Sequence, residues 1–299
     1  MALYHEGERA VQAKAGVQHM ADRVGGMVRP TIPRNVAQFV EEQSFFIVGT
    51  LDSDGRVWAS LVGSMSPFVS IPDAYTMEID RDAIRDERLL ENVAEQGRLG
   101  MIIIDLSKRA RMRINGTATL TDKAIKVTPR EVYGNCQKYI QSRHIELRQA
   151  DLSHDMTPIA TSVLTETQID WIQSADTFFI ASAHQEAGVD VSHRGGMPGF
   201  VRVEDDHTLI FPDYSGNMMF NTLGNITANP KAGLVFIDFE SGSSLQLSGE
   251  ATIIWDETRI AEFAGAERLV QFKVTDSVET PQAIPFSFEF ETYSRFNPR

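Results

Sequence analysis

VDVSHRGGMPGFV, residues 189–201, repeats the pattern of VWASLVGSMSPFV, residues 57–69, and this pair of stretches shows how the chain is organised. Valine, serine, glycine, methionine and phenylalanine recur at the same places, with an offset of 132 residues (189 − 57). The stretches differ most where the later one carries His193 and Arg194 and the earlier one carries two aliphatic residues. Self-similarity at a fixed spacing marks a duplicated structural unit, so the rest of the chain should repeat as well.

Two further blocks keep the same order and nearly the same spacing. FFI at 45–47 recurs at 178–180, an offset of 133 residues (178 − 45). GMIIIDLSKRARMRINGTAT from Gly100 recurs as GLVFIDFESGSSLQLSGEAT from Gly233, again 133 residues on (233 − 100). The chain is therefore predicted to be a tandem duplication of a module of about 100 residues, a common size for one domain.

Each copy has the pattern of a mainly β module with flanking helices. In the first copy, SFFIVGTL and VWASLVG flank the turn DSDGR, which predicts a β-hairpin. GMIIID and GLVFID are typical of strands buried on both faces, whereas RMRINGTATL and LQLSGEATII predict bulged strands. A helix-like stretch precedes each apolar run, DERLLENVAEQ in one copy and NMMFNTLGNITANP in the other. The order strand–strand–strand–helix–strand–strand predicts a small closed barrel with a helix across it.

These patterns divide the chain into four parts. Residues 1–30 form a polar, helical arm, and residues 31–127 form the first copy. Residues 128–163 form a helical insert and linker, because the spacing of apolar residues from Thr128 to Ala150 is helical. Residues 164–299 form the second copy with a C-terminal extension, and Thr165 or Thr167 is expected to cap its first helix.

Composition is that of a soluble globular protein and excludes several function classes. The formal charge of −13 over 299 residues argues against a nucleic-acid partner, because phosphate binding needs a basic face. A single cysteine excludes a disulfide framework and fits a reducing cytosol, so a cytoplasmic location is expected. No apolar run approaches the roughly 18 residues of a membrane span. The N-terminus also lacks a basic-then-apolar signal pattern, so no membrane partner is expected.

A candidate anion site lies in the second copy. Residues 192–196 follow one predicted strand, and FPDYSGNMMFN at 211–221 follows the next strand and opens a helix. An anion needs a guanidinium, hydroxyls and free N–H groups at a helix N-terminus, with glycines that permit close approach. These groups are supplied by Ser192, Arg194, Ser215, Gly216 and Asn217. The alternative is that Gly195 and Gly196 form a bulge and that Arg194 is a surface cation paired with an acid.

Other chemistries have less support. The seven histidines show no spacing typical of a metal site, so no metal is expected. Cys136 is either a nucleophile without a recognisable base or a buried thiol. The sequence contains neither a GxGxxG fingerprint nor a phosphate-binding loop for nucleoside triphosphates.

Six stretches resemble the long, tandem members of the pyridoxamine 5'-phosphate oxidase-like flavin-binding family, and the resemblance covers nearly the whole chain. The stretches are YHEGERAVQ (4–12), NCQKYIQSR (135–143), ADTFFIAS (175–182), GVDVSHRGGMPGFVRV (188–203), FPDYSGNMMFNTLGNITANPKAGLVFIDF (211–239) and LQLSGEA (245–251). The resemblance implies an FMN-binding split-barrel fold in which two barrels meet and FMN lies in the cleft between them. A duplicated chain would supply both barrels.

The resemblance also implies which residues bind the cofactor. Arg194 corresponds to the strand arginine that grips the flavin phosphate, and Ser192, His193 and Gly195 flank the phosphate and the ring edge. The family's phosphate segment corresponds to Asp213, Tyr214, Ser215, Asn217 and Asn221, although a basic run of the family is replaced by DYSGNMMFN. Ser244 and Gln246 match positions that approach the isoalloxazine, and their first-copy counterparts are Arg111 and Arg113. Because Val62 replaces the arginine in the first copy, one flavin per chain is expected.

The leading hypothesis is an FMN-dependent oxidoreductase with an unidentified small-molecule substrate and with NAD(P)H as reductant. His193 is the candidate catalytic residue. The chain lacks the cysteine cluster of an iron–sulfur centre, so an electron-transfer partner would be a separate protein, and a homodimer is also expected. The alternative hypotheses are a non-catalytic module for storage, sensing or electron transfer that holds FMN, FAD or haem, with His193 as the haem ligand, and a structural scaffold. The resemblance reveals no counterpart of the clamp for pyridoxal phosphate.

Overall fold

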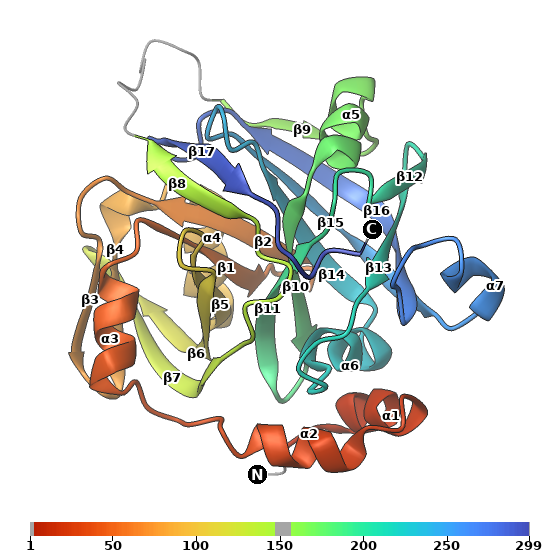
Figure 1. Ribbon diagram of the computed structural model, residues 1–299. Helices are drawn as coiled ribbons and strands as arrows, with labels where there is room; N and C mark the ends of the chain where they lie inside the picture. The colour runs from red at the N-terminus through yellow and green to blue at the C-terminus, as the bar shows by residue number, and fades with distance from the viewer. Residues whose placement is uncertain (1–2, 147–156, 299) are drawn as a thin grey trace.

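The computed structural model describes residues 3–146 and 157–298, and two similar antiparallel sheets pack face to face in it (Figure 1). The first copy forms one sheet from β1 (Phe45–Leu51), β2 (Val57–Gly63), β3 (Val69–Asp73), β4 (Thr76–Asp80), β5 (Arg98–Asp105), β6 (Ala110–Leu120) and β7 (Ala124–Gly134). The second copy forms the other from β10 (Thr177–His184), β11 (Gly188–Gly195), β12 (Arg202–Asp205), β13 (Thr208–Asp213), β14 (Lys231–Ile237), β15 (Ser244–Ile254) and β16 (Arg268–Thr280).

The strand order is equivalent in the two sheets. It is β2-β1-β5-β6-β7-β4-β3 in the first and β11-β10-β14-β15-β16-β13-β12 in the second, where β9 (Ile159–Thr161) also pairs with β16. This equivalence confirms the mainly β, tandemly duplicated fold. The expected closed barrel is wrong in one respect, because in the described residues each sheet is an open path whose end strands do not pair with each other. Each copy is a split barrel.

Helices occupy equivalent places in the two copies. α4 (Glu87–Gln96) and α6 (Asn221–Ala228) each precede the central strand pair, as the sequence predicts, but four strands rather than three come before each of them. α3 (Arg34–Glu41) and α5 (Glu166–Ser174) each precede a first strand, and α3 is absent from the sequence-based prediction. Thr165 caps α5, because its side chain accepts from Gln168 N–H while the Gln168 side chain accepts from Thr165 N–H. A four-residue helix, α7 (Glu257–Ile260), lies between β15 and β16.

The predicted helical insert is wrong where the structure describes it. Residues up to Gly134 continue β7, and β8 (Ser142–Glu146) pairs with β17 (Ser287–Thr292) in a small separate sheet. The sequence AIKVTPREVYG places alternate residues of β7 in the core, and this two-residue period outweighs a helical spacing. The rest of that prediction, at residues 147–156, lies outside the described residues.

The predicted bulges are confirmed at equivalent positions. The pairing of β6 with β7 shifts between Asn115 and Gly116, and that of β15 with β16 shifts between Ser248 and Gly249. A Cβ on Gly116 would lie 2.1 Å from a backbone oxygen of the paired strand, and one on Gly249 would lie 2.0 Å from the equivalent oxygen. The glycines therefore let the long strands bend tightly.

The two sheets are joined by an apolar core between them, to which both copies contribute aliphatic residues and Phe45 and Phe179. At its centre two glycines let the backbones touch. A Cβ on Gly100 would lie 2.3 Å from Val189 O, and one on Gly233 would lie 2.5 Å from Val57 O. The equivalence of these contacts shows that the copies are related by an approximate two-fold arrangement.

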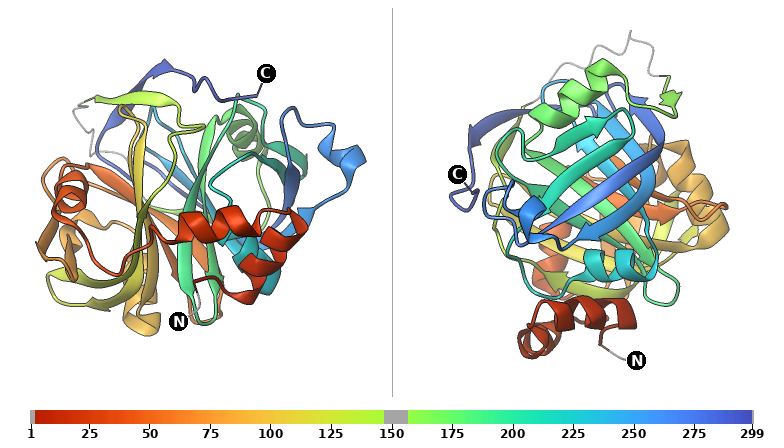
Figure 2. Two further views of the ribbon diagram at one scale, coloured as in Figure 1. Left: turned by 60° about the horizontal axis from the view of Figure 1, so that its bottom comes forward. Right: turned by 90° about the vertical axis from the view of Figure 1, so that its right-hand side faces the viewer.

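The N-terminal arm comprises α1 (Glu6–Lys14) and α2 (Gln18–Gly25) and lies against the second copy beside α6 (Figure 2). α1 and α6 cross at two glycines, because a Cβ on Gly7 would lie 2.2 Å from Gly224 O. The Gln12 side chain fixes the crossing by donating to Met219 O at 3.0 Å. None of the helices in the described part of the chain is long and apolar enough to cross a membrane.

Candidate functional site

A pocket lies at the seam where β11 of the second copy faces β6 of the first (Figure 1). Its other walls are the segment from β13 to α6 and the connection from β7 to β8. Both copies therefore build it. We call it the arginine pocket, because Arg111, Arg113 and Arg194 line it.

Two of the three guanidiniums have carboxylate partners. Arg113 Nη1 lies 3.5 Å from Asp190 Oδ1, and the same group donates to Tyr133 Oη at 3.1 Å. Arg194 pairs with Asp213, but Asp213 is shared with a second arginine, Arg268, at 3.2 Å. Arg268 also pairs with Glu267, so carboxylates balance both cations of this wall.

Arg111 is the uncompensated cation. Its partners are His193 Nδ1, which accepts from Nη1 at 2.9 Å, and the sulfur of Cys136 at 4.0 Å. No carboxylate of the described residues lies within ion-pair distance of it. Burial and the positive charges of Arg113 and Arg194 lower its pKa to about 10, so it stays charged near neutral pH. A buried charge without a counter-charge costs free energy, which a bound anion would offset.

His193 presents a proton to the pocket. Arg111 can only donate, so Nδ1 must accept and the proton of the neutral ring sits on Nε2. Burial, followed by the charge of Arg111, lowers the pKa of His193 well below its usual value, which keeps the ring neutral. Nε2 is buried and has no hydrogen-bond partner among the described residues.

Further buried donors belong to residues that line the pocket. The Nε atoms of Arg111, Arg113 and Arg194 and Nδ2 of Asn135 are also buried and unpaired within residues 3–146 and 157–298. Buried polar atoms are nearly always hydrogen-bonded in folded proteins. A cluster of orphaned donors in one pocket therefore fits a ligand that only accepts, such as a phosphate.

The segment that enters α6 adds backbone donors. Met218 and Phe220 both have positive φ, 64° and 61°, a conformation that costs free energy for residues other than glycine. Phe220 is the N-cap residue and provides no side-chain hydrogen bond, so the first N–H groups of α6 remain open toward the pocket. Ser192 Oγ and Thr222 Oγ1, 2.6 Å apart, lie where this helix start meets β11.

The pocket encloses about 100 Å³, below the roughly 300–1,000 Å³ of typical small-molecule sites. A phosphate-sized group is closer to this volume than a whole nucleotide is. A larger ligand must separate side chains, and the Arg194–Asp213 pair lies directly in the wall.

Most of the candidate residues predicted from the sequence come together here. The pocket lining includes Ser192, His193, Arg194, Gly195, Asp213, Tyr214, Gly216, Asn217 and Asn221. Ser215 lies just outside, and its carbonyl accepts from Tyr139 Oη at 3.1 Å. Arg194 lines the pocket and pairs with Asp213, so the acid partner that the alternative expects is present, although the side chain is mostly buried rather than on the surface.

Ser244 and Gln246 lie elsewhere. They belong to β15, which contacts β2 across the opposite seam, and Gln246 Nε2 donates to Ala59 O at 2.9 Å and to Asp86 Oδ2 at 3.0 Å. Their first-copy counterparts, Arg111 and Arg113, line the arginine pocket instead. The reason is that each seam pairs the hairpin of one copy with the long strand of the other.

A family model described as pyridoxamine 5'-phosphate oxidase matches residues 32–147 and 164–287, one match per copy. The chain belongs to the pyridoxamine 5'-phosphate oxidase family. This confirms the resemblance seen in the sequence. A search of curated proteins found no relative.

Three similar solved structures each align with about two-fifths of this chain. HupZ of group A Streptococcus is 16% identical over 37% of this chain and 90% of its own, with a TM-score of 0.31. An FMN-binding protein from Syntrophomonas wolfei is 11% identical over 38% and 84%, with a TM-score of 0.28. The FAD binding protein from Mycobacterium smegmatis is 17% identical over 40% and 99%, with a TM-score of 0.29.

Sequence reasoning did not select several lining residues of this family member. Asn135 and Tyr139 come from a connection predicted as helix, and Thr222 is the second residue of α6. Cys136, expected to be a nucleophile or a buried thiol, also lines the pocket and is exposed rather than buried. Arg111 and Arg113 carried a usable signal. The pattern RMR puts two cations on one face of a strand, at the positions that match Ser244 and Gln246.

Proposed function

We propose that the chain binds one FMN, with its phosphate in the arginine pocket, and acts as an FMN-dependent oxidoreductase. The observation that carries the proposal is that Arg111, which has no carboxylate partner among the described residues, lines one pocket together with buried donors that are unpaired there and with the start of α6. The family to which the chain belongs supports a flavin rather than another phosphorylated ligand.

The residues of the pocket fit the phosphate end of such a cofactor. Arg111 supplies the net positive charge, and the N–H groups that open α6 supply neutral donors. Ser192 and Thr222 supply hydroxyls on the same side. The flavin, when bound, supplies the redox chemistry.

His193 would orient the ligand rather than exchange protons with it. Its neutral ring keeps a proton on Nε2 because Nδ1 is occupied by Arg111, so it donates a fixed hydrogen bond into the pocket. We therefore expect no acid–base step at His193 near neutral pH. NAD(P)H is the proposed reductant.

The same geometry does not fit a haem ligand. An axial histidine binds iron through an unprotonated nitrogen and usually donates from its other nitrogen. In His193 the arrangement is reversed, because Nδ1 accepts from Arg111 and Nε2 carries the proton.

Titration of purified, cofactor-free protein with FMN tests the binding. We expect saturation at one FMN per chain, with the absorption and fluorescence changes of a bound flavin. Rapid bleaching of the bound flavin by NADH or NADPH, followed by reoxidation with a small oxidant, would support turnover. A stoichiometry of two, or no binding, contradicts the assignment of one pocket per chain, whereas binding without reduction supports a non-catalytic holder.

A further inference from the structure

A second cavity lies beneath the N-terminal arm. It encloses about 290 Å³ between α1, the turn from β10 to β11, and the strands β6 and β7. We call it the arm cavity. It lies next to the arginine pocket, since Asn221 lines both. Its lining is mainly acidic, because Glu8, Glu131 and Asp190 face it, although Arg130 lines it as well.

The carboxylates of the arm cavity are buried close to one another. Asn115 bridges two of them, since its Nδ2 donates to Glu131 Oε2 at 3.1 Å and to Asp190 Oδ1 at 3.3 Å. Glu8 is 5% exposed and accepts from Asn221 Nδ2 at 2.7 Å. Burial, together with the negative charges of Glu131 and Asp190, raises the pKa of Glu8 to about 8, although hydrogen bonds from His5 N–H and Asn221 act against that shift.

The nearby imidazole does not neutralise Glu8. His5 Nε2 lies 3.4 Å from Glu8 Oε2. Burial, followed by the neighbouring His184, lowers the pKa of His5, so the ring is neutral near pH 7. Asp190 already pairs with Arg113, so Glu8 and Glu131 are the acids that a ligand would meet. Burial raises the pKa of Glu131, and the positive charge of Arg130 acts against that shift.

A separate observation also points to a missing donor. Asn115 lines the cavity and is only 4% exposed, and its Oδ1 has no hydrogen-bond partner in the described part of the chain. Its Nδ2 is committed to the two carboxylates, so the amide orientation is fixed. An acceptor oxygen without a donor, beside repelling carboxylates, fits a ligand that carries N–H groups and positive charge.

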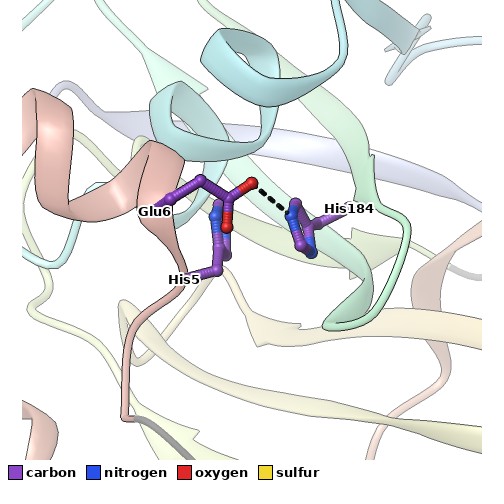
Figure 3. Close-up of side chains that lie close together, drawn as sticks. All are labelled: His5, Glu6 and His184. Atoms are coloured by element: carbon purple, nitrogen blue, oxygen red, sulfur yellow. Dashed lines mark hydrogen bonds and ion pairs between the residues drawn. The ribbon is translucent and has the colours of Figure 1, made fainter.

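A bare metal ion fits less well. Three potential metal ligands in the described residues meet within 4.8 Å at His5, Glu6 and His184, on the rim of the cavity (Figure 3). Both rings already use their nitrogens in the neutral form. His184 Nδ1 accepts from two backbone N–H groups while Nε2 donates to Glu6, and His5 Nδ1 accepts from Gly7 N–H while Nε2 donates to Asn225. A metal at either Nε2 would need the proton on Nδ1, where the backbone donors leave no room.

We propose that the arm cavity binds a small organic ammonium ion, held by Glu8, Glu131 and the free oxygen of Asn115. The position beside the arginine pocket would place a cationic molecule next to the group bound there. The inference depends on the arm cavity alone and does not require that FMN binds.

Calorimetric titration of the full chain with 1,4-diaminobutane tests the proposal, with 1,4-butanediol as the uncharged control. We expect one site per chain with a dissociation constant of about 1 mM or below, and no binding of the diol. At pH 9, where Glu8 is ionised, Glu131→Gln and Glu8→Gln should each weaken binding about tenfold or more, because each removes one counter-charge. Glu250→Gln, at an exposed acid of β15, is the matched control and should bind as the unmodified chain does.

Several results would overturn the proposal. One is the absence of a heat of binding when the unmodified chain is titrated with the diamine. Another is equal affinity for the diamine in the two cavity variants and the control. A third is displacement of the diamine by Mg²⁺ or Ca²⁺. Thermal denaturation of each variant establishes that it is folded. The titration is repeated with FMN present: retained diamine binding supports a separate site, whereas displacement by FMN would assign the cavity to the flavin. FMN binding is measured on its own, so either proposal can fail without the other.

Discussion

The two seams between the barrels are built from equivalent strands, but different side chains line them. At one seam β11 meets β6, and Ser192 lies beside Arg111 and Arg113. At the other β2 meets β15, and the equivalent Ser60 lies beside Gln246, whose amide donates to it at 3.1 Å. Among the described residues, the first seam leaves several donors unpaired, whereas the amide of Gln246 in the second is hydrogen-bonded within the protein.

The position of Val62 explains why the second seam offers no comparable site. Val62 is 1% exposed and belongs to the apolar core of the first barrel, whereas its counterpart Arg194 lines a pocket. Ser60 Oγ donates to Asp86 Oδ2 at 2.7 Å, which closes the place where a helix start would otherwise receive an anion. One seam therefore serves to join the two barrels, whereas the other contains a buried positive charge that a bound anion would neutralise.

The largest expected effect comes from making the two seams alike. Arg111→Ser gives the arginine pocket the residue found at Ser244. We expect FMN affinity to fall about 100-fold, because the uncompensated cation is lost. Stability of the cofactor-free protein should hold or rise slightly, since a buried charge without a counter-charge disappears.

Ser244→Ala is the control for that change, because it alters the equivalent position of the other seam. Fluorescence titration with FMN should give an unchanged dissociation constant for this variant. Equal losses in Arg111→Ser and Ser244→Ala would contradict the assignment of the flavin phosphate to one seam.

The second effect concerns the two glycines at which the backbones of the two copies touch. Gly100→Ala and Gly233→Ala each place a Cβ within 2.3 or 2.5 Å of a carbonyl oxygen of the other copy. We expect each to lower the free energy of unfolding by about 2–3 kcal/mol, as overpacking does. Thermal denaturation measures it, with Gly26→Ala as the control, where the nearest atom to the new Cβ is 3.7 Å away. A large loss for one glycine alone would break the two-fold equivalence.

The third effect tests the arm, which packs on α6 of the second copy. The pKa of Glu8 is raised from 4.5 to about 8, so the folded state holds a proton that the unfolded chain releases. The contribution of Glu8 to stability is therefore present at low pH and is lost as pH rises from about 4.5 to 8. Glu8→Gln should reduce that slope, which thermal denaturation at pH 5 and pH 8 would show. Parallel curves for the two proteins would mean that Glu8 is not neutral in the folded state.

The smallest effect compares α3 and α5, the helices that precede the first strand of each copy. α5 has a capping box at Thr165, whereas α3 begins after Pro33 without a side-chain cap. Thr165→Ala should cost about 1 kcal/mol of unfolding free energy in urea denaturation. Thr167→Ala, which leaves the cap intact, should cost less. If both variants cost the same, the capping box does not explain the difference between the helices.

Most of the fold could be predicted from the repeat, because both copies contain the same alternation of buried residues and the same glycines at the bulges. The site follows only in part. Aligning the copies establishes that Arg111 matches Ser244, but it does not state which copy's long strand faces which hairpin. That choice depends on packing between the sheets, around Gly100 and Gly233. The helical prediction for the segment from Thr128 was wrong because this segment belongs to β7. Its alternate residues are buried when the strand pairs with β6.

The closeness of Gly100 to Val189 and of Gly233 to Val57 has a consequence for how such a protein can change. In a symmetric pair of identical barrels, every substitution appears at both seams. A desolvated arginine would then be introduced twice. In a tandem chain the residues of each seam can change independently. Three arginines can therefore line one seam, while the other keeps the packed valine, serine and glutamine that join the two copies.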